Sequence, residues 1–158
     1  MSVDWGVVPI VPEAYEWLQE AGYNISGLQS RFPTLEEMLL VLESFNDSLP
    51  ITRSNYSDDS WTLTVGTSES SQYACILGSV QGDGLFHFHF FGSNCQEETM
   101  IEIMKRLAPL CGPLTLYESI AATPIVVTKD LEVPVALEEW HIRIKQNYSE
   151  FDNHQSGY

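Results

Sequence analysis

Two histidines, His87 and His89, stand two residues apart in the run His-Phe-His-Phe-Phe. Alternate residues of a β-strand point to the same face of its sheet, so both imidazole rings are expected on one face. Such a pair can supply two ligands to a metal ion, with Asp83, His141 or Cys75 as further ligands if the fold brings them near. The alternative is that both histidines are hydrogen-bonded side chains on a partly buried sheet face.

The same two histidines could act as acid–base groups, because imidazole titrates near neutral pH. Cys95 is a conceivable nucleophile, since it is expected in the first turn of a helix, where the helix dipole lowers the pKa of a thiol. No motif fixes a base beside this cysteine. The sequence therefore assigns no catalytic residue and no cofactor, and it favours a protein that is not an enzyme. A small-molecule or metal-binding protein or enzyme with a pocket at His87 and His89 is the alternative.

Net charge is the most informative property of the whole chain. Twenty-two acidic residues against seven lysines and arginines give a net charge of −15 over 158 residues. The first fifty residues alone carry eight acids and one base, so the acidity is not confined to a tail. A field of this sign repels nucleic acid and anionic membranes and attracts cationic partners. We therefore expect a basic protein as the partner, and neither nucleic acid nor a membrane.

Two expected helices in the first third of the chain carry glutamates, and two aspartates follow in a polar stretch. If the two helices are neighbours, their outer faces form one negative surface that could plug the cationic site of another protein. The expected partner-binding residues are Glu13, Glu16, Glu20, Glu36, Glu37, Glu43, Asp58 and Asp59. The leading hypothesis is a non-enzymatic acidic binding protein, such as an inhibitor or immunity-type protein that masks a cationic partner. A further hypothesis is an assembly subunit that self-associates through the predicted hairpin or the strand next to it.

Capping signals and apolar periodicity locate the helices. A helix is predicted over residues 12–21, because a proline stands at its first position and a glycine follows its end. Thr34 and Glu37 form a capping box that opens a second helix, which is expected to end near residue 46. A third helix is expected to begin at residue 93 or 94 and to end before a Gly-Pro pair. Residues 137–146 fit both a helix and a strand, and their composition favours a helix.

Alternating apolar residues and turn signals locate the strands, which are expected at residues 61–65, 73–80, 85–91, 114–117 and 124–127. A hairpin with Gly82 and Asp83 at a two-residue tip places His87 opposite Gly78. In that register the histidines lie on one face, and Cys75 lies on the other with the phenylalanines. Residues 50–59 are polar and rich in turn formers, so they are expected to form a loop.

These elements predict an α+β fold of the order helix–helix–strand–strand–strand–helix–strand–strand–helix. Tight connections favour a mainly antiparallel sheet of about five strands with helices packed on it. The expected organisation is a single domain over residues 1–146, followed by a polar, frayed tail over residues 147–158. Three cysteines without a Cys-x-x-Cys motif indicate free thiols in a reducing compartment, so a cytoplasmic location is expected.

Overall fold

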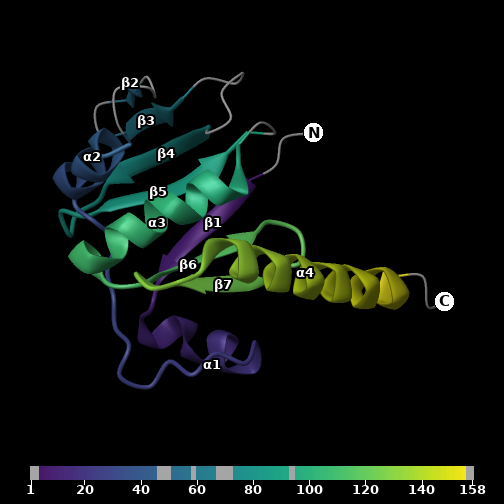
Figure 1. Cartoon of the computed structure of the whole chain (residues 1–158). Coiled ribbons are helices and arrows are strands. Elements are labelled where there is room, and N and C mark those ends of the chain that lie inside the picture. The colour runs from purple at the N-terminus through teal and green to yellow at the C-terminus, as the bar shows by residue number, and fades with distance from the viewer. Residues whose placement is uncertain (1–3, 46–50, 58–59, 67–72, 93–94, 156–158) are drawn as a thin grey trace.

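A computed structural model describes residues 4–45, 51–57, 60–66, 73–92 and 95–155 of the chain. All of its strands belong to one antiparallel sheet, whose strand order is β2-β3-β4-β5-β1-β6-β7 (Figure 1). The strands are β1 (Asp4–Pro9), β2 (Ile51–Ser57), β3 (Ser60–Val65), β4 (Ala74–Val80), β5 (Phe86–Phe91), β6 (Leu114–Glu118) and β7 (Pro124–Val127). The predicted α+β class, with helices packed on an antiparallel sheet, is confirmed, although the sheet has seven strands instead of about five.

The helices are α1 (Pro12–Glu20), α2 (Leu35–Glu43), α3 (Glu97–Cys111) and α4 (Val133–Gln155). The capping box of α2 is present, because the Glu37 amide donates to the Thr34 hydroxyl and the Thr34 amide donates to the Glu37 carboxylate. Helix α4 settles the ambiguous segment as a helix and continues into the residues expected to form a tail. Among the described helices, none combines the length and the apolar content of a membrane span.

Two strands differ from the expectation. The segment Ile51–Ser57 was predicted as part of a loop, but it pairs with β3 as the edge strand β2, because backbone pairing does not require apolar side chains at a sheet edge. No strand was predicted at Asp4–Pro9, yet β1 lies between β5 and β6 and joins the two halves of the sheet. Its short length, with Gly6 inside it and Pro9 at its end, gives a weak strand pattern, and the strand is completed by pairing with β5 and β6, which lie far away in the sequence.

The hairpin of β4 and β5 has a different register from the predicted one. Its loop has three residues, because the Gly84 amide donates to the Gln81 carbonyl and Gly84 then takes a positive φ of 79°. Val80 therefore pairs with Phe86, and His87 pairs with Ser79 instead of Gly78. Since a shift of one residue exchanges the two faces of a strand, the predicted distribution of side chains over the faces was wrong.

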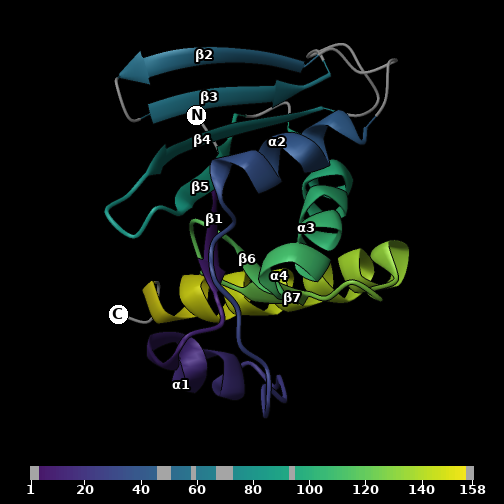
Figure 2. The ribbon, with the colours of Figure 1, turned by 90° about the vertical axis from the view of Figure 1, so that its left-hand side faces the viewer.

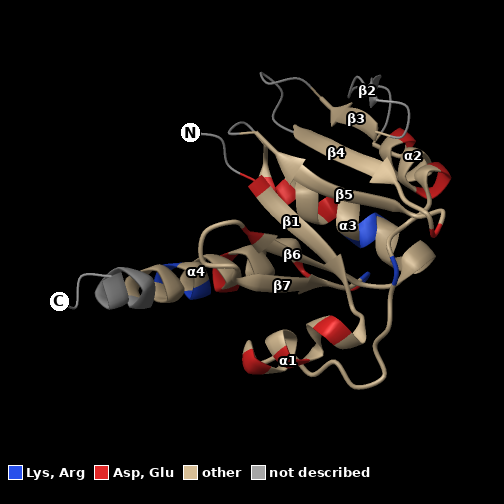
Figure 3. Cartoon of the chain, turned by 180° about the vertical axis from the view of Figure 1, so that it is seen from behind, with Lys and Arg blue, Asp and Glu red and all other residues tan. Residues whose placement is uncertain are grey.

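Helices α2, α3 and α4 cover one face of the sheet, which carries Phe86, Phe88 and Phe90 of β5. Met38 and Leu42 of α2 and Trp140 of α4 enter the same large core. Helix α1 packs near the β6–β7 end on the opposite face, where its residues form a separate, smaller cluster with Val126. None of the helices that the structure describes covers the outer face of β3, β4 and β5, as Figure 3 shows from behind.

Helix α3 begins later than predicted. Its first residue is Glu97 and its N-cap is Gln96, whereas residues 93 and 94 lie outside the described residues. The Gln96 amide donates to the Tyr73 carbonyl at 2.7 Å, so the chain stays extended against the start of β4 before it can turn into a helix. The predicted end is confirmed, since the helix stops at Cys111 and Gly112 follows.

Candidate binding surface

The acidic helices α1 and α2 do not form the single surface that was considered for neighbouring helices. They lie at opposite ends of the molecule (Figures 2 and 3), and they pack into different hydrophobic clusters on opposite faces of the sheet. The glutamates of α1 and those of α2 consequently form two separate acidic surfaces. Asp58 and Asp59, which were predicted to extend the surface, lie outside the described residues.

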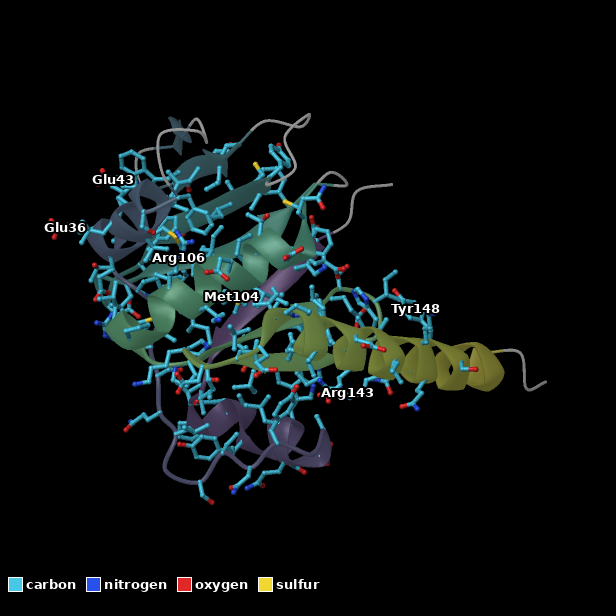
Figure 4. The ribbon with its side chains drawn as sticks, in the orientation of Figure 1. Glu36, Glu43, Met104, Arg106, Arg143 and Tyr148 are labelled. Atoms are coloured by element: carbon cyan, nitrogen blue, oxygen red, sulfur yellow. The ribbon has the colours of Figure 1, made fainter. Side chains whose placement is uncertain are left out.

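Glu37 is engaged within the chain. Its carboxylate accepts two hydrogen bonds from the Arg31 guanidinium, at 2.8 and 3.0 Å, and it also caps α2 through the Thr34 amide. These contacts, above all the hydrogen bond from Arg31, hold the Glu37 pKa below its usual value. Glu36 and Glu43 are exposed and project away from α2 (Figure 4), so they are the carboxylates of this helix that a partner can reach.

A shallow apolar groove lies beside these two glutamates, between α2 and α3. It has a volume of about 540 Å³ and is lined by Leu40, Val41, Ser44, Arg106, Pro109 and Leu110; we call it the α2–α3 groove. Leu40 is 61% exposed and Leu110 is 43% exposed. Because Glu36, Leu40 and Glu43 follow one another at spacings of four and three, they share one face of α2. An exposed leucine is therefore flanked by two carboxylates.

The one cationic residue in the lining of the groove is already paired within the chain. Arg106 contacts Glu102 at 3.2 Å, donates to the Ser44 carbonyl at 3.0 Å, and lies 3.9 Å from the centre of the Phe45 ring. Its guanidinium therefore ties α3 to the end of α2 (Figure 4). Because Arg106 is paired with Glu102, the groove presents a mainly apolar surface to a partner. The carboxylates of Glu36 and Glu43 lie beside it and form its acidic rim.

The two histidines share one face, as predicted, and it is the outer face of the sheet. His87 contacts the Asp83 carboxylate at 3.0 Å and lies against the Phe32 ring, with 4.4 Å between ring centres. His141 is engaged elsewhere, since it contacts Glu97 at 2.8 Å. Within the described part of the chain, no group of three His, Cys, Asp or Glu side chains is placed to hold a metal ion. Among the described residues, no third side chain is therefore placed to complete a metal site with His87 and His89.

The expected reactive position of Cys95 was wrong. Cys95 precedes α3 instead of lying in its first turn, and its thiol accepts from the Cys75 amide and lies 3.0 Å from the Phe91 carbonyl. Burial raises the pKa of the Cys95 thiol and also that of Cys75. Cys111 is buried as well, with a pKa raised to about 11. A raised pKa keeps a thiol protonated at neutral pH and therefore unreactive as a nucleophile.

Comparison with known proteins adds no family to this description, since neither a protein-family model nor a curated protein nor a solved structure matches the chain. The candidate binding surface is therefore argued only from the residues and geometry of this chain. Sequence reasoning overlooked Leu40 and Leu110, although both carried a signal. Each is a large apolar residue that falls outside the buried stripe of its own helix.

Proposed function

We propose that this chain is a non-enzymatic binding protein that masks a basic protein partner, and that the α2–α3 groove with its acidic rim is the contact surface. The observation that carries the proposal is an exposed leucine, Leu40, between two exposed glutamates on a chain of net charge −15. The carboxylates supply attraction and orientation, and the leucines supply apolar area to bury.

The two contributions differ in size and in their response to salt. Burying an exposed leucine contributes about 1.5–3 kcal/mol, an effect that salt does not screen. Charges at an interface rim chiefly raise the association rate, and their effect fades over a Debye length of about 8 Å at physiological ionic strength. A partner that suits this surface therefore carries lysines or arginines around an apolar anchor. An inhibitor or immunity-type protein that covers the cationic site of a toxin or nuclease is the specific form of this proposal.

Charge reversal tests the location of the surface. The tagged protein is incubated with lysate of its own source at low salt, and the captured proteins are identified and measured for stoichiometry and for release by salt. Glu36→Lys with Glu43→Lys is expected to abolish capture of a basic partner. The matched control, Glu16→Lys with Glu20→Lys on α1, makes the same change in net charge at the other end of the molecule and is expected to retain capture.

If both double variants lose capture of the partner equally, the proposed contact surface is wrong. The overall negative charge of the chain, and not Glu36 and Glu43, would then explain binding. A stoichiometric partner that is not basic, or whose binding ignores salt, would overturn the proposal itself. Capture of further copies of the same chain alone would favour self-association instead.

Truncation of the apolar anchor tests the second contribution with the purified partner. Leu40→Ala is expected to weaken binding by about 10- to 100-fold, as truncation of a well-buried interface residue does. Ile142→Ala on α4 is the matched control, because Ile142 is likewise exposed but distant from the groove. Neither variant is expected to change the free energy of unfolding by more than about 0.5 kcal/mol, since both side chains are exposed. Unchanged affinity in Leu40→Ala would exclude the groove as the contact.

A further inference from the structure

A second pocket lies on the opposite side of the molecule, at the seam between β1 and β5. It has a volume of about 380 Å³, which falls within the range of sites for small molecules. Its lining residues are Asp4, Trp5, Gly6, Val7, Phe88, His89, Tyr117 and Ser119. Trp5, Val7 and Phe88 belong to the core face of the sheet and form an apolar floor, whereas His89 and Tyr117 belong to the outer face.

The pocket exists because the two central strands diverge. The β1–β5 ladder contains the pairs Asp4–Phe91 and Trp5–Phe90, and beyond them the strands separate (Figure 3). The connector between α1 and α2 fills the far end of the gap, where the Phe86 amide donates to the Pro33 carbonyl at 2.7 Å. The near end stays open at the outer face. A gap in the centre of a sheet is thus left between two well-paired halves.

Gly6 and Tyr117 shape one wall of the pocket. They pair across β1 and β6, and a Cβ atom at position 6 would overlap the Tyr117 ring. The glycine therefore lets the phenol lie across β1. Trp17 of α1 holds the ring from the other side in an edge-to-face contact, with 5.4 Å between ring centres. The Tyr117 hydroxyl is consequently fixed at the seam.

Four polar side chains meet at this pocket without partners of their own. Asp4, His89, Tyr117 and Ser119 make no side-chain hydrogen bond to any other residue that the structure describes; His89 has a ring contact with Phe91, and Tyr117 has the contact with Trp17. His89 and Tyr117 are half-buried, whereas Asp4 and Ser119 are exposed at the mouth of the pocket. Polar side chains that are not used within the described chain, placed around an apolar floor, can fix the orientation of a mostly apolar ligand.

We propose that this pocket binds a small primary amine with a short apolar body. Each of the four polar groups can accept a hydrogen bond, and an ammonium group has three to donate. Asp4 is the one charged residue in the lining, so a cation gains an ion pair there, whereas an anion meets a carboxylate inside the field of a chain of net charge −15. The carbon atoms of the ligand lie over Val7 and Phe88.

The amine could be a free metabolite-sized molecule or the side chain of a lysine in another protein, since both present the same ammonium group. The site shares no residue with the α2–α3 groove. The amine proposal and the proposed function can therefore fail independently, because charge reversal at Glu36 and Glu43 leaves this pocket intact.

The test is a titration of the full chain, followed by amide chemical shifts and by calorimetry at pH 7. The probes are phenethylamine, its neutral counterpart 2-phenylethanol and its anionic counterpart phenylacetate, together with N-acetyl-lysine methylamide for the lysine side chain. Phenethylamine or the lysine derivative is expected to shift the amides of residues 4–7, 88–89 and 117–119, and whichever of the two binds more tightly identifies the source of the amine. The neutral and anionic counterparts are expected to bind at least 10-fold more weakly.

Asp4→Asn is expected to weaken amine binding at least 10-fold, whereas Asp130→Asn, which removes an exposed carboxylate elsewhere, leaves it unchanged. Ser119→Ala provides a second variant that keeps the charge, and a loss of two- to fivefold is expected from one missing acceptor. The proposal is overturned if neither amine shifts these amides, if 2-phenylethanol binds as well as phenethylamine, or if Asp4→Asn and Asp130→Asn behave alike.

Discussion

Helices α1 and α2 carry the same amount of charge and differ in what surrounds it. Each spans nine residues and contains three glutamates. Helix α2 packs Met38, Val41 and Leu42 into the large core, whereas α1 packs Ala14 and Leu18 into a small cluster on the other face of the sheet. Leu40 remains exposed on α2, while the exposed residues of α1 are polar apart from a proline.

This difference is the reason why we propose α2, and not the equally charged α1, as part of the contact surface. A negative field attracts basic molecules to both helices, but affinity needs apolar area that leaves water on contact. On α2 the apolar area lies between the carboxylates and continues into the α2–α3 groove. The same comparison also concerns stability, because one helix belongs to the main core and the other to a small cluster.

Truncation of the core residue of each helix has the largest expected effect. Leu42→Ala is expected to lower the free energy of unfolding by about 2–5 kcal/mol, because a leucine with no exposure leaves a cavity in the main core. Leu18→Ala is expected to release α1 locally, with faster hydrogen exchange over residues 12–28 and a smaller loss of global stability. Urea unfolding with hydrogen exchange distinguishes the two. An equal global loss, with no local exchange in Leu18→Ala, would show that both helices belong to one cooperative unit.

The helix caps give the next largest effect. Thr34→Ala is expected to cost about 1 kcal/mol, because it removes the side-chain acceptor of the α2 capping box. Helix α1 has no side-chain cap at Val11, so Val11→Ser is expected to stabilise by about 0.5 kcal/mol. Thermal unfolding of both variants measures the contrast. A neutral Thr34→Ala would mean that tertiary packing alone holds the start of α2.

A buried hydroxyl near α1 gives an effect of opposite sign. The Thr115 hydroxyl is fully buried and has no hydrogen-bond partner among the described residues, so Thr115→Val is expected to stabilise by about 1 kcal/mol. Thr123→Val is the matched control, because the Thr123 hydroxyl accepts from the Asn147 amide at 2.7 Å and its loss is expected to destabilise. Urea midpoints measure both changes, and destabilisation by Thr115→Val would indicate that water satisfies the Thr115 hydroxyl.

Acidification gives the smallest effect, and for α2 it acts through Glu37. The folded-state pKa of Glu37 lies below its usual value of 4.5, so the Arg31–Glu37 contact stabilises fully above that value and is lost as the pH falls through the lower folded pKa. Between about pH 5 and pH 3, the wild type is therefore expected to lose more stability than Glu37→Gln, by less than about 1 kcal/mol because the pair is partly exposed. Glu43→Gln, which removes an exposed carboxylate that has no ion pair with any described residue, serves as the control. Identical pH profiles of wild type and Glu37→Gln would contradict the assigned role of Arg31.

Local sequence patterns predicted most of the helices and strands. The capping box at Thr34, the alternation in β3, the turn residues between β4 and β5 and the apolar stripe of α3 depend on residues close in sequence, and each of these patterns correctly located a helix or a strand. The acidity could also be predicted from the sequence, because charge adds along the chain. So could the common face of His87 and His89, because successive side chains of a strand alternate between its two faces.

Tertiary structure decided where these elements lie relative to one another. One extra loop residue at Gly84 exchanged the faces of the hairpin, and the insertion of β1 between β5 and β6 placed α1 and α2 on opposite sides of the sheet. That same insertion created the seam pocket and separated the two acidic surfaces. The sequence by itself determined the elements and the charge, because these follow from neighbouring residues. The proposed binding surfaces depend on pairings between segments far apart in the chain, which no local pattern encodes.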